Sequence, residues 1–126
     1  MIALLYIGAG GFFGSVSRFL VARISANYFG TFPYGTLFVN VTGTFILAFI
    51  NYLVLSGKTT IPLDYRNLIT GGFIGAYTTM STFSFESMRY LDQGKYLYFA
   101  LNICLNIGLC LLAVIAGRYC ALLIGR

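Results

Sequence analysis

The sequence predicts an all-α membrane protein with four transmembrane helices. Of its 126 residues, 59% are hydrophobic and only 9% are charged, whereas about a quarter of the residues of an ordinary soluble domain are charged. One helix needs roughly 20 mostly apolar residues to cross the hydrocarbon core of a bilayer. Four such helices occupy most of the chain, so we expect residues 1–126 to form a single transmembrane domain without a folded soluble part.

The four spans are expected at about residues 2–24, 36–55, 67–90 and 96–123. Gly and Pro within residues 27–35, Pro62 within the polar loop 58–66, and a polar turn at 91–95 separate them. The first residues lack a basic n-region and a cleavage site, so we interpret them as a retained span and not a signal peptide. Tyrosines near the predicted ends fit an aromatic belt at the level of the lipid headgroups: Tyr28, Tyr34, Tyr52, Tyr65, Tyr90, Tyr96 and Tyr119.

Basic residues are almost evenly divided between the two sides of the membrane. An excess of Lys and Arg in cytoplasmic loops normally sets the orientation. Nearly equal numbers of Lys and Arg on the two sides favour a chain that inserts both ways and pairs as an antiparallel, dual-topology homodimer. The alternative is a weak bias that still gives one orientation. One side carries Lys58, Arg66, Arg118 and Arg126, and the other carries Arg23, Arg89 and Lys95.

The formal net charge of +5 does not indicate nucleic-acid binding, because the chain has no basic run. Cations at helix ends instead suit anionic lipid headgroups, so membrane lipid is the expected partner and nucleic acid is not. The cysteines at 104, 110 and 120 lack metal-ligand spacing, and the chain contains no His. A zinc site is therefore not expected.

Polar side chains inside the predicted spans need a partner, a cavity or water. Arg18 lies in the first span, and its guanidinium cannot lose its charge. Two polar stripes lie in the other spans: Thr36, Asn40, Gly43 and Thr44 share a face of the second, and Asn102, Asn106 and Cys110 form an i, i+4, i+8 stripe in the fourth. Interhelical hydrogen bonds explain such residues in many bundles. Two polar stripes together with Arg18 favour a shared polar path.

The third span contains a segment that is unfavourable for a helix. Glycines at 71, 72 and 75 precede Thr78, Thr79, Met80, Ser81 and Thr82, and both Gly and β-branched Thr weaken a helix. We expect a broken helix whose exposed carbonyls attract a cation; a continuous helix back-bonded by its Thr and Ser hydroxyls is the alternative. Further along, Glu86 and Arg89 are compatible with either an interfacial pair or a pore role.

Three segments, in this order, resemble the Fluc (CrcB-type) fluoride channels. They are residues 10–19 (GGFFGSVSRF), residues 35–43 (GTLFVNVTG) and residues 72–86 (GFIGAYTTMSTFSFE). The resemblance implies passive, fluoride-selective export across the bacterial inner (plasma) membrane by a multi-pass antiparallel homodimer with two pores and a central structural sodium ion, Na+.

The resemblance also implies roles for individual residues. The backbone carbonyls of Gly75 and Thr78 from both subunits would hold the sodium, and Arg18 would line an aqueous vestibule. Asn40 would hydrogen-bond fluoride, and Phe83 would present its ring edge to the ion. The complete set expected along the fluoride pore is Asn40, Thr79, Met80, Ser81, Thr82, Phe83, Glu86, Asn102 and Asn106.

Met80 departs from the family pattern, which has Phe at this position. Methionine is flexible and offers no ring edge to an anion. We therefore expect conduction to persist but to be slower than with Phe.

Two other functions are considered. A small dual-topology multidrug exporter would need a carboxylate in the first span, which has Arg18 and no acid. A structural subunit of a larger membrane complex would show no transport by itself. We do not expect an enzyme, because the sequence offers no nucleophile–base pair or metal constellation.

Overall fold

The computed structural model describes residues 1–57 and 59–124, and all regular elements in these two ranges are helical. Three helices are long and apolar enough to cross a membrane: α1 (Ile2–Tyr28), α2 (Tyr34–Leu55) and α6 (Tyr96–Ile124). The segment between α2 and α6 forms a fourth, broken helix. It consists of α3 (Leu63–Arg66), the π-helix η1 (Asn67–Ile74), α4 (Gly75–Tyr77) and α5 (Met80–Asp92).

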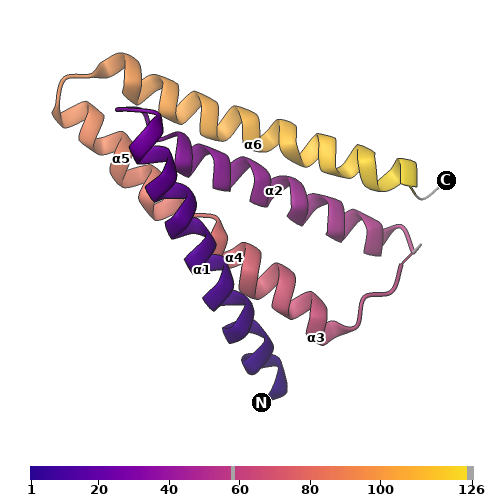
Figure 1. Ribbon diagram of the computed structural model, residues 1–126. Helices are drawn as coiled ribbons and strands as arrows, with labels where there is room; N and C mark the ends of the chain where they lie inside the picture. Colours follow the sequence, from indigo (N-terminus) through magenta and orange to yellow (C-terminus); the bar gives the residue numbers. More distant parts are fainter. Residues whose placement is uncertain (58, 125–126) are drawn as a thin grey trace.

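The helices form two neighbouring groups (Figure 1). α2 and α6 run side by side along most of their length, while α1 packs mainly against η1 and α4. α5 lies against α6. The connection from α1 to α2 and the connection from α5 to α6 lie toward one end of the molecule, and both termini lie toward the other (Figure 1).

The predicted helical segments are present, but several of their bounds were wrong. α1 continues to Tyr28, beyond the predicted end near residue 24, so the connection to α2 is only residues 29–33. Pro62 caps a helix that begins inside the predicted 58–66 loop, because a proline suits the start of a helix, where its missing N–H costs nothing. Lys58 and Arg126, which entered the prediction of orientation, lie outside the described residues.

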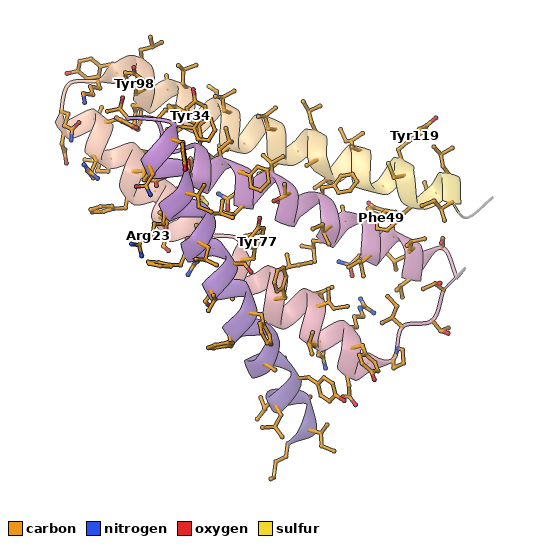
Figure 2. The ribbon with its side chains drawn as sticks, viewed as in Figure 1. Arg23, Tyr34, Phe49, Tyr77, Tyr98 and Tyr119 are labelled. Carbon is orange, nitrogen blue, oxygen red and sulfur yellow. The ribbon has the colours of Figure 1, made fainter. Side chains whose placement is uncertain are left out.

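At least one tyrosine of the predicted belt does not fit it. Tyr34 and Tyr119 lie exposed toward opposite ends of the molecule (Figure 2). Tyr90, however, is buried at 8% exposure; its hydroxyl donates to the carbonyl of Thr31 and its ring stacks on Tyr98. It therefore ties α5 to the α1–α2 connection and does not face lipid headgroups.

Glycines allow α1 to approach η1 closely, as the spacing of Gly10 and Gly14 predicts. A Cβ atom at Gly10 would overlap the carbonyl oxygen of Leu68, and one at Gly14 would overlap the carbonyl oxygen of Phe73. From the other side, a Cβ on Gly72 would lie 2.5 Å from the carbonyl oxygen of Ile7. The backbones of the two helices are therefore in direct contact.

The broken helix is confirmed, and the alternative of a continuous third helix is wrong. Thr78 and Thr79 both leave the helical region, with φ −79° and ψ 156° at Thr78 and φ −150° and ψ 111° at Thr79. Thr79 caps α5, since its side chain accepts a hydrogen bond from the backbone N–H of Thr82 at 3.2 Å. Tyr77, the last residue of α4, lies between α4 and α2 (Figure 2), with its hydroxyl 3.2 Å from that of Thr42.

Candidate functional site: a polar cavity at the helix break

Asn40 of α2 holds the interruption between α4 and α5 in place. Its Oδ1 accepts a 2.8 Å hydrogen bond from the backbone N–H of Thr79, and its Nδ2 donates to the carbonyl of Thr79 at 3.2 Å. The same Nδ2 donates to Oδ1 of Asn106 on α6 at 3.0 Å. The side-chain amide thus supplies the acceptor that the N–H of Thr79 loses by leaving the helix, and it adds a donor to the carbonyl of Thr79.

A second group of polar contacts joins α6 to α5. Nδ2 of Asn106 donates to both the backbone oxygen and Oδ1 of Asn102, at 3.0 and 2.9 Å. Nδ2 of Asn102, which is completely buried, donates to the hydroxyl of Ser87 at 3.0 Å. The two polar stripes predicted on α2 and α6 therefore meet, through Asn40 and Asn106.

A cavity of about 250 Å³ opens beside this network. Phe83 lies buried in its wall at 6% exposure, whereas Met80 is 71% exposed. Amide groups, threonine hydroxyls and an aromatic ring therefore surround one small space. Its lining is Asn40, Thr44, Thr78, Thr79, Met80, Phe83, Asn106, Ile107 and Cys110.

The cavity brings together part of the expected pore set: Asn40, Thr79, Met80, Phe83 and Asn106. The other members lie elsewhere. Ser81 and Thr82 are exposed on α5, and their hydroxyls lie 3.3 and 3.0 Å from that of Thr79. Asn102 reaches the cavity only through Asn106.

Glu86 belongs to a separate, second cavity, of about 410 Å³. Its Oε1 accepts a 2.7 Å hydrogen bond from the hydroxyl of Thr36 on α2. Its Oε2 is buried and has no hydrogen-bond partner in the described part of the chain. Thr36 lies one helical turn before Asn40, so Glu86 stands beside the polar face that leads to the break.

Arg18 contacts the break itself. Its Nη1 donates to the carbonyl of Thr78 over 3.4 Å, which is long for a hydrogen bond. The guanidinium is half-buried and brings a permanent positive charge to the point where α4 ends. Arg18 therefore lies close to one of the carbonyls that the resemblance assigns to sodium.

The backbone at the break is suited to a cation held by oxygen atoms. In a continuous helix the N–H of Thr79 would donate to the carbonyl of Gly75, four residues earlier. Here that N–H donates to Asn40 instead, so the oxygen of Gly75 loses its helical donor. Gly75 is exposed and Thr78 half-exposed, which leaves this side of the break open in a single chain. Carbonyl oxygens are suitable ligands for a hard cation.

Two lining residues outside the expected pore set, Thr44 and Cys110, belong to the polar stripes that helical spacing predicts, because each follows a pore residue, Asn40 or Asn106, by four positions. Sequence reasoning did miss the role of Ser87. The partnership of Ser87 with Asn102 had no such signal, because it joins two helices whose relative register the sequence does not give.

A family model described as CrcB-like protein, Camphor Resistance (CrcB), matches residues 5–118 of the chain. The chain belongs to this CrcB-like family. Relatives named fluoride-specific ion channel FluC align over nearly its full length. The protein of Methanocaldococcus jannaschii is 46% identical over 123 residues, which cover 98% of this chain and 97% of that one. The protein of Campylobacter lari is 43% identical over 116 residues, with coverage of 90% and 93%.

Membership of the CrcB-like family and three apolar helices of spanning length identify a multi-pass membrane protein. Within this CrcB-like chain, the segments at residues 10–19, 35–43 and 72–86 come together around the helix break. The break cavity takes residues from the second and third of these segments, and Arg18 approaches it from the first.

Proposed function

We propose that this chain is a fluoride-selective channel that lets fluoride cross the membrane passively, down its electrochemical gradient. The single observation that carries the proposal is the cavity at the helix break, where the amides of Asn40 and Asn106 and the ring of Phe83 converge. The relatives, which are named fluoride-specific ion channel FluC, point to the same ion. The cavity supplies the chemistry that a small, strongly hydrated anion needs.

Fluoride must exchange its water for donors in order to enter such a cavity. The N-terminus of α5 offers backbone N–H groups and the positive end of a helix dipole. Asn40 and Asn106 carry further N–H groups, but these already donate to protein oxygens. Fluoride would take the place of a protein oxygen as the acceptor of one of these N–H groups. The exchange of one acceptor for another gives little net gain, so fluoride binds weakly. Conduction requires an ion that can leave as well as enter.

Phe83 gives the cavity a group that can face an anion without donating a hydrogen bond. The edge of an aromatic ring carries positive quadrupole density, and Phe83 lies buried in the wall of the cavity. Met80 occupies the rim as a flexible, exposed side chain. A flexible thioether leaves the route open but stabilises fluoride less than a second ring would.

The proposal includes an antiparallel homodimer with two pores. It is supported by the nearly even division of basic residues between the two sides predicted from the sequence, four against three, and by the exposed position of Ser81 and Thr82, which a lipid-facing surface would not favour. The carbonyls of Gly75 and Thr78 from two chains would hold a central sodium ion. Bound there, sodium would supply a fixed positive charge close to an anion path.

The test is fluoride efflux from liposomes that contain the purified chain, measured with a fluoride electrode. Chloride efflux from matched liposomes is the parallel measurement. Fast fluoride efflux with negligible chloride efflux supports the channel. A chain that reconstitutes as a folded protein but passes neither ion contradicts it.

A further inference from the structure

The second cavity lies at the end of the molecule where α1 connects to α2. It occupies about 410 Å³ between these two helices and the C-terminal half of α5. Thr31, Arg89, Gln93 and Lys95 of its lining are exposed, so the cavity is accessible to water. Its lining is Ala22, Ser25, Ala26, Gly30, Thr31, Phe32, Pro33, Gly35, Thr36, Glu86, Arg89, Tyr90, Gln93 and Lys95.

This cavity leads toward the cavity at the helix break. Thr36 lines this second, larger cavity, and Asn40 lines the cavity at the helix break. Residues four apart lie on the same face of a helix. Thr36 is buried at 5% exposure, and its hydroxyl donates to Glu86 at 2.7 Å. One turn of α2 therefore separates the inner end of the larger cavity from the donors around the break.

The charges in the larger cavity are arranged by depth. Glu86 is at the inner end, with one carboxylate oxygen bonded to Thr36 and the other buried. Arg89 and Lys95 are exposed and line its outer part. Two cations against one carboxylate leave the cavity net positive. The protein around the cavity has a low dielectric constant, and a cleft with a net charge focuses the field of that charge.

We infer that Arg89 and Lys95 form an anion-collecting mouth, which raises the local fluoride concentration at one end of the conduction path. This inference rests on the proposed function. The two side chains act through their long-range field and through transient pairing with the ion, and they do not take part in the dehydrated site at the break. Their effect is therefore on the rate at which fluoride arrives, and it decreases as salt screens the field.

The experiment measures fluoride efflux from liposomes at subsaturating fluoride, for the wild type, Arg89→Gln, Lys95→Gln and the double variant. Ionic strength is set with a salt of an impermeant anion. At about 10 mM salt, where screening extends over roughly 30 Å, we expect the double variant to lose about tenfold in flux, within the range known for electrostatic focusing. At about 1 M salt, where screening extends over roughly 3 Å, the difference should nearly vanish.

Two matched variants separate the mouth from general charge effects. Arg89→Lys keeps the charge and should keep most of the flux. Arg23→Gln removes an exposed cation of α1 that lies outside the cavity lining; Figure 2 shows its side chain at the periphery of the molecule. It should change low-salt flux by less than about twofold, because its field is not confined by a cleft.

Three outcomes would overturn the inference while leaving the proposed function in place. A loss in Arg23→Gln equal to that in Arg89→Gln would mean that net surface charge alone matters. A loss that persists at high salt would assign Arg89 and Lys95 a structural role. Unchanged flux in the double variant at low salt would exclude the mouth while leaving the proposed channel intact. A wild type without fluoride flux would instead remove the proposed function and this inference with it.

Discussion

At the scale of single residues, Asn40 is the centre of the candidate site. Its amide joins the backbone of Thr79 to the side chain of Asn106, with both acceptor and donor atoms in use. The sequence identified each of these residues as polar and intramembrane. Their mutual contact could not be predicted, because it depends on how far α2 and α6 are shifted along one another. Helical periodicity gives the face of a residue but not its partner on another helix.

The first prediction is that Asn40→Asp lowers fluoride flux at least tenfold while the protein still folds. The substitution keeps the acceptor for the N–H of Thr79 but replaces the donating NH₂ group with a second, negative oxygen. That oxygen would repel both fluoride and Oδ1 of Asn106, and a buried group left unsatisfied costs about 1–3 kcal/mol.

Liposome efflux should fall at least tenfold for Asn40→Asp. Asn27→Asp is the matched control, because Asn27 is an exposed residue near the end of α1 and its flux should stay close to that of the wild type. Retained flux in Asn40→Asp would exclude a donor role for Asn40.

The second prediction concerns Met80. Met80→Phe should raise fluoride flux several-fold, because a second ring edge at the rim of the cavity would stabilise the anion where the exposed thioether does not. Efflux at matched protein-to-lipid ratios measures the change. Equal flux for Met80→Phe and the wild type would show that Met80 does not weaken the site.

At the scale of the elements, the broken helix between α2 and α6 combines a feature that the sequence predicts with one that it does not. The glycines and threonines of residues 71–82 correctly indicated a break, because they disfavour a helix locally. The π-helix at Asn67–Ile74 was not indicated. π-helices are rare, and this one packs with its backbone against Gly10 and Gly14 of α1. Its geometry follows from a tertiary contact and not from local propensity.

The third prediction tests that contact. Gly14→Ala should destabilise the fold by about 1–3 kcal/mol, as overpacking of a close-packed core does, because the added methyl group would overlap the backbone of Phe73. Gly8→Ala on the same helix is the control, since a Cβ atom there meets nothing within 4 Å. Thermal unfolding in detergent compares the two variants. Equal midpoints would show that α1 can withdraw from η1 without cost.

At the scale of the whole molecule, composition was sufficient for the class of protein and the number of crossings, because the thickness of the bilayer fixes the length of a span. Composition was not sufficient to predict what covers the exposed surface of the single chain. α1 exposes Phe12, Phe13 and Phe19, which lipid or a second chain could cover equally well. α5 exposes Ser81 and Thr82 together with Met80 and Phe85, which makes a face of mixed polarity. The proposed antiparallel dimer would cover this face with a second copy of the chain.

The fourth prediction tests whether that copy is antiparallel. Thr59→Lys with Thr60→Lys adds positive charge at the end that holds both termini, and Asn27→Lys with Asp92→Lys adds it at the other end. Because Lys and Arg bias loops toward the cytoplasm, each double variant should insert in mainly one orientation. Expressed alone, each should lose at least about tenfold of its fluoride flux, since an antiparallel pair needs both orientations.

Co-expression of the two oppositely biased chains should restore the flux. Restoration of flux by co-expression distinguishes a lack of oppositely oriented partners from damage to the fold. A chain that misfolds because of its added lysines cannot be rescued by a partner with lysines elsewhere. Cysteine-accessibility labelling from each side of the membrane reports the orientation independently of transport. Full flux from either biased chain alone, with its single orientation verified by labelling, would exclude the antiparallel dimer and leave a parallel assembly or a single chain as the conducting unit.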